Sequence, residues 1–180
     1  MRILNCLLCF CILLSTSCSK AANPAVEFFN KAEAAYYEKN YKEAIEWCKK
    51  SAELGNPMAM VRLGAIYHNG TCGTLKDYKE SLKWRKKAAE LGNPIAMAAL
   101  GSMYYFGEGT LRDYKESFKW YKKSAELGNP MAMALLGGQY YLGLGTLKDP
   151  QQAKYWVKKA YDAGDQYAEG VWNDFELWKY

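Results

Sequence analysis

The residue types best suited to chemistry in this sequence are His68 and Cys72, which stand four residues apart at the end of an expected helix. A thiol next to an imidazole can act as a nucleophile that is activated by a base. Such a pair also needs an orienting third group and an oxyanion hole, and no residue near them in sequence supplies either. We therefore interpret the two residues as a loop cysteine near an exposed histidine, and we predict that the chain has no catalytic residue.

Other motifs for catalysis or ligand binding have a structural explanation. His68 is the only histidine among 180 residues, which excludes a histidine-rich metal site and any mechanism that needs two imidazoles. Gly-x-Gly occurs at Gly107 and again at Gly143, in the same place of two successive repeats, so it indicates a turn and not a phosphate-binding loop. The sequence therefore predicts no cofactor and no bound metal.

The composition indicates a folded domain of modest positive charge. The chain has 24 Lys and Arg residues against 19 Asp and Glu, with 50% hydrophobic and 15% aromatic residues. This apolar content excludes a disordered chain, and the length suits one domain and not two. A lysine pair follows each of four tryptophans and is interpreted as a solvated outer stripe, so nucleic acid is not an expected partner. The pairs are Lys49-Lys50, Lys86-Lys87, Lys122-Lys123 and Lys158-Lys159.

The first 17 residues have the pattern of a signal peptide. They begin with Met1-Arg2, continue with an apolar run over 3–14, and end in small polar residues. The apolar run is shorter than the roughly 20 residues that cross a membrane as a helix. Cys18 follows directly and resembles the lipidated cysteine of bacterial lipoproteins, although Ser15 stands where that motif usually has leucine. We expect an exported protein with a lipid anchor at Cys18, in the outer membrane more than the inner; the alternative is cleavage elsewhere and release into the periplasm.

Behind this segment the sequence consists of four copies of one unit. Leu-Gly-Asn occurs three times and is followed by proline each time, and a fourth version reads Ala163-Gly164-Asp165. Tryptophan and aspartate recur at the same spacing, which indicates stacked copies of one structural unit. We expect a short tether over 18–25 and one domain over 26–180, with repeats at about 26–56, 57–93, 94–129 and 130–165 and a closing helix over 166–180.

Each repeat has the signals of two helices joined by a turn. The glycine of Leu-Gly-Asn lies just past a helix end, the asparagine can cap the next helix, and proline suits its first position. That next helix carries Leu-Gly-x-x-Tyr, whose glycine lets a partner helix approach closely. Asp77-x-x-Glu80 and Asp113-x-x-Glu116 fit the capping box that begins a second helix. The local signals agree on an all-α fold.

The sequence of these repeats resembles the Sel1-like repeat (SLR) family, a relative of the tetratricopeptide repeat. The unit from Pro94 to Asn129 contains the family's Leu-Gly, Tyr, Gly-x-Gly-Thr-Leu, Asp-Tyr and Trp-Tyr-Lys-Lys segments in order. Repeat one departs from this pattern, because Tyr36 to Tyr41 form a short turn without Gly-x-Gly. The resemblance implies an α-solenoid, a right-handed superhelix of helix pairs with one concave face. It also implies a non-enzymatic module that binds another protein in a preformed groove.

Two narrower functions follow from particular branches of this family. Some SLR lipoproteins neutralise secreted toxins, which makes an immunity protein one specific form of the binding hypothesis. A cysteine-rich branch is associated with penicillin binding and weak β-lactamase activity, and this is the alternative function. That branch carries cysteine pairs eight residues apart, whereas this chain has alanine and methionine there, at Ala52 and Met60, Ala89 and Met97, and Ala125 and Met133.

The resemblance also implies where a partner binds. In this family the first helix of each pair lines the concave face, and the positions just after the repeat's tyrosine point into it. These positions form a row that is low in charge and rich in aromatic residues, a composition enriched at interface hot spots. The alternative is that the rings pack against the neighbouring repeat as part of the core. The expected partner-binding residues are Tyr36, Tyr37, His68, Asn69, Tyr105, Phe106, Tyr141 and Leu142.

Cys48 and Cys72 are the two cysteines of the repeats, and the sequence leaves their pairing open. Cys48 replaces Arg85, Tyr121 and Val157 of the other repeats, so packing does not require a thiol there, and an oxidising compartment would permit a disulfide. Against the bridge, Cys48 lies mid-helix, roughly 10 Å from the turn along the helix axis at 1.5 Å per residue. That distance exceeds the Cα separation of about 4.4–6.8 Å that a disulfide spans.

Overall fold

The structure, a computed structural model, describes residues 23–174, and within this range the chain consists of helices and turns without a strand. The expected signal peptide and Cys18 lie outside the described residues. The helices are α2 (Pro24–Tyr37), α3 (Tyr41–Glu53), α4 (Pro57–Asn69), α5 (Tyr78–Glu90), α6 (Pro94–Phe106), α7 (Tyr114–Glu126), α8 (Pro130–Leu142), α9 (Pro150–Asp162) and α10 (Gln166–Asp174).

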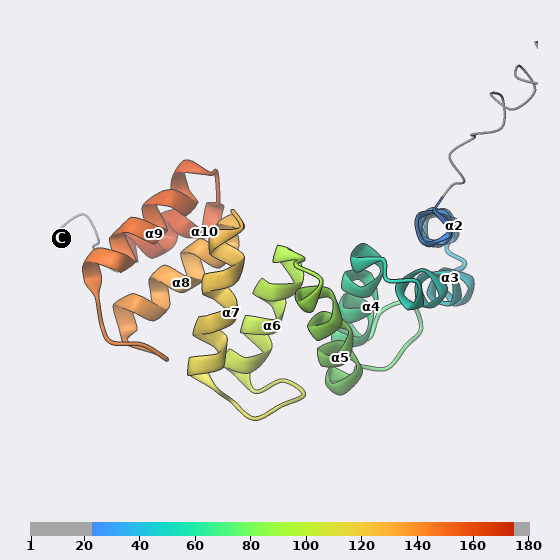
Figure 1. Ribbon diagram of the computed structural model, residues 1–180, viewed down its shortest axis with the longest axis horizontal. Helices are drawn as coiled ribbons and strands as arrows, with labels where there is room; N and C mark the ends of the chain where they lie inside the picture. The colour runs from blue at the N-terminus through green and yellow to red at the C-terminus, as the bar shows by residue number, and fades with distance from the viewer. Residues whose placement is uncertain (1–22, 175–180) are drawn as a thin grey trace, which may run out of the picture.

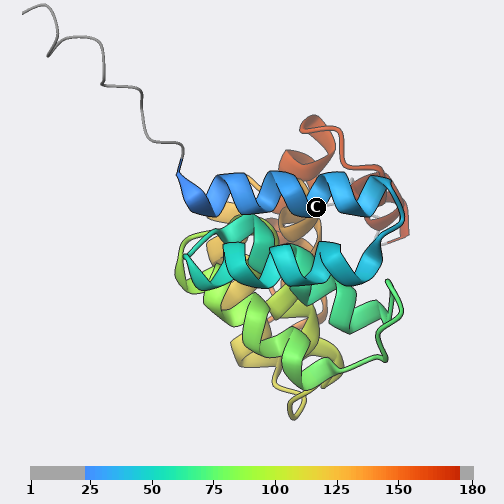
Figure 2. The ribbon, with the colours of Figure 1, turned by 90° about the vertical axis from the view of Figure 1, so that its right-hand side faces the viewer.

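The helices are stacked in pairs along one direction. The first helix of each pair packs most extensively against the second helix of its own pair, and the second helix packs against the first helix of the next pair. The array is arched, with α2 and α9 near its two ends (Figure 1), and Figure 2 shows α2 and α3 side by side at one end. The prediction of an all-α solenoid of four helix pairs with a closing helix is confirmed.

Asparagine and aspartate side chains cap most of these helices. Oδ1 of Asn56 accepts a hydrogen bond from the backbone N–H of Met58 at 2.9 Å, which satisfies a group that the helix itself leaves unpaired. The same Asn-Pro pair occurs at Asn23-Pro24, where Asn23 accepts from the N–H of Ala25 at 3.0 Å. The first helix therefore begins at Pro24, and the expected tether over 18–25 was wrong at its C-terminal end by two residues.

A glycine in each first helix of repeats two to four lets the paired helix approach closely. A Cβ atom at Gly64 would lie 2.8 Å from Cγ of Arg85, and a Cβ atom at Gly101 would lie 2.7 Å from Cδ1 of Tyr121. The corresponding glycine of the fourth repeat faces Val157 in the same way. The side chain opposite the glycine differs in chemistry from repeat to repeat, and this difference determines what the neighbouring surface presents.

The recurring tryptophans are buried only in the interior of the array. Trp84 and Trp120 are 7% and 8% exposed and belong to a core cluster with apolar side chains of the first helices. Trp47 and Trp156, in the first and last repeats, are half-buried. Nζ of Lys123 lies 4.6 Å from the ring centroid of Trp120, a cation–π contact that each repeat reproduces. The second lysine of each pair therefore covers a tryptophan ring. The sequence analysis expected the lysine pairs to form a solvated outer stripe and did not predict this contact.

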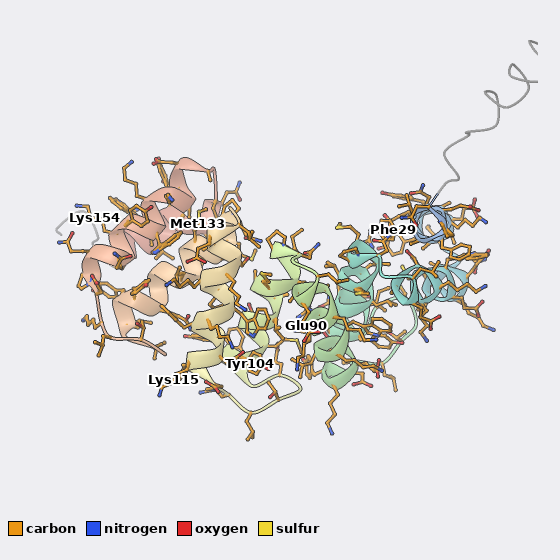
Figure 3. The ribbon with its side chains drawn as sticks, viewed as in Figure 1. Phe29, Glu90, Tyr104, Lys115, Met133 and Lys154 are labelled. Atoms are coloured by element: carbon orange, nitrogen blue, oxygen red, sulfur yellow. The ribbon has the colours of Figure 1, made fainter. Side chains whose placement is uncertain are left out.

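Helix α10 closes the array at its C-terminal end. Ala168 and Val171 of α10 are buried against the fourth repeat. The expected closing helix over 166–180 is described as far as residue 174, and the rest lies outside the described residues. Figure 3 shows Met133 inside the array, whereas Lys115 and Lys154 point outward. No helix between residues 23 and 174 combines the length and the apolar character that a bilayer crossing needs.

Candidate functional site

Two adjoining pockets form a groove along the first helices of the repeats. One pocket, called the apolar pocket below, has a volume of about 280 Å³ and is bounded by α6, α7, α8, the turn that follows α8, and α10. The other, called the polar pocket, has a volume of about 480 Å³ and is bounded by α4, α5, α6, the turn that follows α6, and the start of α8. Ser102 and Phe106 line both pockets, so the groove is continuous along α6.

The apolar pocket is lined entirely by uncharged side chains. Its lining includes Phe106 and Leu142, which are 61% and 52% exposed, and Tyr167 of α10, which is 58% exposed. No Asp, Glu, Lys, Arg or His side chain is among its described lining residues. Exposed apolar side chains around a neutral hollow favour an uncharged and largely apolar occupant.

Tyr121 anchors a chain of hydrogen bonds in the wall of the apolar pocket. Its ring lies over Gly101 and is 2% exposed, and its hydroxyl lies 3.0 Å from Oγ of Ser102. Ser102 donates its own proton to the carbonyl of Ala98 at 3.2 Å, so Tyr121 donates to Ser102. Burial raises the pKa of Tyr121 to about 12, although hydrogen bonds with Ser102 and Ser117 act in the opposite direction. The hydroxyl therefore keeps its proton near neutral pH.

Among the residues that line the apolar pocket, Gln139 has a buried polar atom without a hydrogen-bond partner in the described part of the chain. It is 2% exposed, and its Nε2 donates to Oγ of Ser117 at 3.0 Å. Its Oε1 is buried and accepts no hydrogen bond. The corresponding positions of the second and third repeats hold Ile66 and Met103, which are buried and apolar. The fourth repeat thus places an unpaired acceptor where its neighbours have hydrocarbon.

The polar pocket contains a hydrogen-bonded carboxylate and a half-buried arginine. Nε2 of His68 lies 2.9 Å from Oε2 of Glu108, which belongs to the turn of the next repeat. The side chain of Arg85 packs over Gly64, and burial lowers the pKa of Arg85 while nearby Glu108 raises it. A guanidinium keeps its charge in proteins, so this half of the groove presents both signs of charge.

Four of the eight expected binding residues line the groove. His68 lines the polar pocket, Tyr105 and Leu142 line the apolar pocket, and Phe106 lines both. Asn69 lies beside the groove, where its Oδ1 is 3.0 Å from Nδ1 of His68. Half of the predicted surface therefore lies along this groove, over repeats two to four.

The remaining expected residues lie outside these two pockets. Tyr36 and Tyr37 are exposed on the first repeat, where the ring of Tyr36 lies 5.4 Å from the guanidinium carbon of Arg62. Tyr141 is half-buried, with Nζ of Lys148 lying 5.1 Å from its ring centroid. The alternative of packing within the array fits half-buried Tyr141, whereas Tyr36 and Tyr37 are exposed on the first repeat, away from the two pockets.

Arg85, Tyr121 and Gln139 are among the residues of the groove that the sequence analysis did not identify. Arg85 and Tyr121 stand opposite the repeat's glycine, at a position that the sequence analysis compared only in connection with Cys48. Gln139 was detectable in principle, because it is polar at a position that is apolar in the preceding two repeats. Comparing the repeats with each other, position by position, would have found all three.

The arrangement around His68 and Cys72 does not form a nucleophile and its base. The two ring nitrogens of His68 lie within hydrogen-bond distance of Asn69 and Glu108, and Cys72 is the partner of neither nitrogen. Between residues 23 and 174 no group of three or more His, Cys, Asp or Glu side chains is placed to hold a metal ion. What the groove offers is shape, apolar surface and hydrogen-bonding groups, which are the means of binding.

The two cysteines of the repeats are free thiols in the structure, so it does not contain the bridge that the sequence left open. Cys48 is 2% exposed, whereas Cys72 is half-buried in its turn, with a positive φ of 58°. Burial raises the pKa of Cys48 from its ordinary 9.0 to about 11, and Arg62 acts in the opposite direction. Because the folded pKa is raised, the thiol stabilises the fold below about pH 9, and this contribution is lost as the pH rises toward 11.

We expect iodoacetamide at about pH 8 to modify Cys72 in the folded protein and to leave Cys48 unmodified. The thiolate is the reactive form, and Cys48 is both buried and protonated at this pH. Mass spectrometry of peptides labelled before and after unfolding shows which of the two cysteines reacts in the folded protein. Equal labelling of both cysteines in the folded state would contradict the burial of Cys48. Failure of both to react even after unfolding, without reductant, would demonstrate a disulfide.

A family model described as Sel1 repeat matches residues 33–56, 57–93, 94–129 and 130–165. A Sel1 repeat protein from Oxalobacter formigenes is 38% identical with a TM-score of 0.72, over 78% of this chain and 57% of that one. A protective antigen present in uropathogenic Escherichia coli strains, which displays an SLR fold, is 37% identical with a TM-score of 0.67, over 70% of this chain and 27% of that one. This chain therefore corresponds to only part of each of these proteins.

A third structure is similar in fold alone. The cysteine-rich protein B of Helicobacter pylori is 24% identical with a TM-score of 0.58, over 73% of this chain and 94% of that one. No curated protein matches the chain in sequence. The comparisons therefore establish the type of repeat and its architecture.

Proposed function

Because this chain belongs to the Sel1 repeat family, whose members are generally protein-interaction modules, we propose that it is a non-enzymatic adaptor that binds another protein in the groove. The observation that carries the proposal is the apolar pocket with its exposed rim. Phe106 and Leu142 are large apolar side chains that remain 61% and 52% exposed beside a neutral hollow. Such a combination of an apolar patch and a pocket marks an interaction site.

The proposal places this adaptor in the cell envelope. The signal pattern over 1–17 supports export, and Cys18 supports a lipid anchor that faces the periplasm from the outer membrane. Labelling of growing cells with a palmitate analogue tests the anchor, with a Cys18→Ala variant as the control. Absence of label from the wild-type protein would favour a signal cleaved at another position and a released protein.

A narrower form of the same proposal is that the partner is a secreted toxin and that binding neutralises it. The groove supports this use because a preformed surface can cover a partner without any chemical change to it. The test is co-expression of the chain with a toxin encoded beside it, with survival of the cells as the readout. Survival that does not depend on the chain would exclude this narrower form and leave the adaptor function in place.

The adaptor function predicts that Phe106→Ala combined with Leu142→Ala weakens partner capture at least thirtyfold. Truncation of a single hot-spot side chain costs about 2 kcal/mol or more, and that corresponds to about thirtyfold in affinity. Both side chains are exposed, so the helical circular dichroism should be unchanged. They are a better pair than Tyr105 and Tyr141, because those two tyrosines are half-buried and their truncation could disturb the fold.

The measurement is capture from envelope extract by the full-length protein, followed by titration of the captured partner. Leu111→Ala with Leu147→Ala is the matched control, because both leucines are 87% exposed in turns and neither lines the groove. Equal losses in the two double variants would place the partner outside the groove. Hydrolysis of nitrocefin by the purified protein, abolished by one substitution, would instead favour the β-lactamase alternative.

A further inference from the structure

The guanidinium of Arg85 lies in the polar pocket without a hydrogen bond to any residue in the described part of the chain. The other two described arginines both have partners. Arg62 donates to both carboxylate oxygens of Glu33 at 2.7 Å, and Arg112 donates to the hydroxyl of Tyr114 at 3.4 Å. A guanidinium has five N–H donors, and withdrawing it from water without replacing its hydrogen bonds is unfavourable. The polar pocket therefore holds a charged donor whose hydrogen bonds the fold leaves unmade.

The nitrogen atoms of this guanidinium open into the pocket. The stem of Arg85 packs over Gly64, with Cγ and Nε lying 2.8 and 3.4 Å from the place that a Cβ atom there would take. This contact holds the stem and leaves the side chain half-buried in the pocket wall. Within residues 23–174, fully buried polar side-chain atoms without a partner belong to Trp84, Trp120 and Gln139, and Arg85 has none. Its unpaired N–H groups therefore remain accessible to a molecule that enters the polar pocket.

Neither a close counter-charge nor the packing of the repeats accounts for the charge of Arg85. The carboxylate of Glu108 attracts Arg85 but lies 2.9 Å from Nε2 of His68, and it forms no ion pair with Arg85. The other repeats have buried, uncharged residues at the position of Arg85, namely Cys48, Tyr121 and Val157. Stacking of the repeats therefore requires no charge at this position, and the charge of Arg85 is available for a ligand.

The lining of the polar pocket restricts what this guanidinium can bind. The planar fork of an arginine matches a carboxylate, which accepts two parallel hydrogen bonds from it. A phosphate group carries about two negative charges, whereas the lining offers one arginine with Glu108 nearby, so a single negative charge is better balanced here. Ile95, Phe106 and Met131 are 51%, 61% and 57% exposed around the same pocket. They offer apolar contact to the group that carries the carboxylate.

We propose that the polar pocket binds an acidic side chain of the partner protein, with the guanidinium of Arg85 donating to both carboxylate oxygens. This inference rests on the proposed function and adds the chemical group that the groove recognises. The groove continues along α6 into the apolar pocket, so a partner that occupies both pockets passes through the polar pocket and presents a side chain there, not a chain end. The methylene groups of a glutamate would contact Ile95 and Met131, and arginine is among the residues most enriched at interface hot spots.

The experiment is a titration of the full chain with two probes, followed by ligand-observed NMR at low salt. One probe is N-acetylglutamate α-amide, whose only carboxylate is in the side chain, and the other is N-acetylglutamine amide. The two have nearly the same shape and differ in charge. We expect the glutamate probe to bind at least tenfold more tightly, because only a carboxylate can form charge-assisted hydrogen bonds with Arg85. Equal affinity of the two probes for the wild-type chain would overturn the inference.

Three variants test whether Arg85 is the source of this preference. Arg85→Met retains an unbranched stem over Gly64 and should bind the two probes with equal affinity. Arg112→Met, at an exposed arginine outside the pocket, should leave the preference unchanged. Glu108→Gln removes a carboxylate that repels a bound anion, so it should strengthen binding of the glutamate probe alone. A purely structural role of Arg85 predicts no such gain, and a preference that persists in Arg85→Met would contradict the proposal.

Two further probes test the other possible occupants. N-acetylleucine carries its carboxylate at the end of the chain, and inorganic phosphate carries a larger negative charge. Both should bind more weakly than the glutamate probe. Tighter binding of N-acetylleucine would assign the pocket to a chain end, and tighter binding of phosphate would assign it to a phosphorylated group. Either result would overturn the choice of an acidic side chain.

The inference and the proposed function fail in different ways. If the glutamate probe shows no preference while the Phe106 and Leu142 substitutions still weaken capture, the groove binds a partner without an acidic side chain at Arg85. If capture is insensitive to those substitutions, the adaptor proposal itself fails at this site. The probe titration needs no partner, so its outcome does not depend on capture.

Discussion

Replacing Trp120 by alanine should lower the thermal midpoint of the chain by roughly 6–20 °C. Trp120 is 8% exposed and joins the core that connects successive repeats. Truncation of a buried tryptophan typically costs about 3–5 kcal/mol, and about 1 kcal/mol moves the midpoint by about 2–4 °C in a chain of this size. In a solenoid the loss of an interior contact weakens the coupling on both sides, so the effect is not confined to one repeat.

Two further variants test whether burial of the tryptophan ring is the cause of the lost stability. Trp156→Ala in the last repeat should have a clearly smaller effect, because Trp156 is only half-buried. Trp120→Phe should retain most of the stability, since it keeps an aromatic ring and removes Nε1, a buried donor that has no partner among the described residues. Calorimetry measures the thermal midpoints of the three variants and so ranks their stabilities. Equal and small shifts for both alanine variants would show that the tryptophans contribute little to the core.

The second large effect is expected for Gly145→Ala, which should lower the free energy of unfolding by about 2–4 kcal/mol. The φ of Gly145 is 75°, a conformation that costs an L-residue about 1–2 kcal/mol. A Cβ there would also collide with the carbonyl oxygen of Tyr114 and lie 2.9 Å from the backbone nitrogen of Lys115. These are backbone atoms at the start of α7, so the contact cannot be relieved by rotating a side chain, and the turn must shift away from the preceding repeat.

Gly128→Ala is the matched control for the backbone conformation. Its φ is 88°, yet a Cβ at this position would meet nothing within 4 Å. Gly128→Ala should therefore cost only the free energy of placing an L-residue at a positive φ, about 1–2 kcal/mol. Denaturant unfolding of the two variants measures the difference, which isolates the packing of the turn on α7. Equal losses would mean that the turn does not depend on close contact with the preceding repeat.

The side chain of Gln139 differs in chemistry from the residue at the same position of the third repeat, Met103. Methionine there would restore the apolar residue of the third repeat and remove an unpaired buried acceptor, so the fold should be as stable or more stable.

The sequence by itself determined the helix pairs, because their signals are local. A cap such as Asn56, the proline after it and the glycine at the helix end each act within a few residues, so one unit predicts the next. The first helix begins at Pro24, inside the expected tether, and its Asn-Pro signal could have been predicted by the same rule. Repetition therefore gave the architecture without any knowledge of distant contacts.

Only the tertiary structure decided which residues form the groove. Glu108 reaches His68 across 40 positions of sequence, and Tyr167 of α10 meets Phe106 at a pocket that involves four helices. A repeat pattern fixes the positions that are the same in every unit, whereas a binding site depends on the positions that differ and on how neighbouring units bring them together. The sequence identified Phe106 and Leu142 from their place in the unit, but the unpaired acceptor of Gln139 became visible only when the surrounding donors had positions in space.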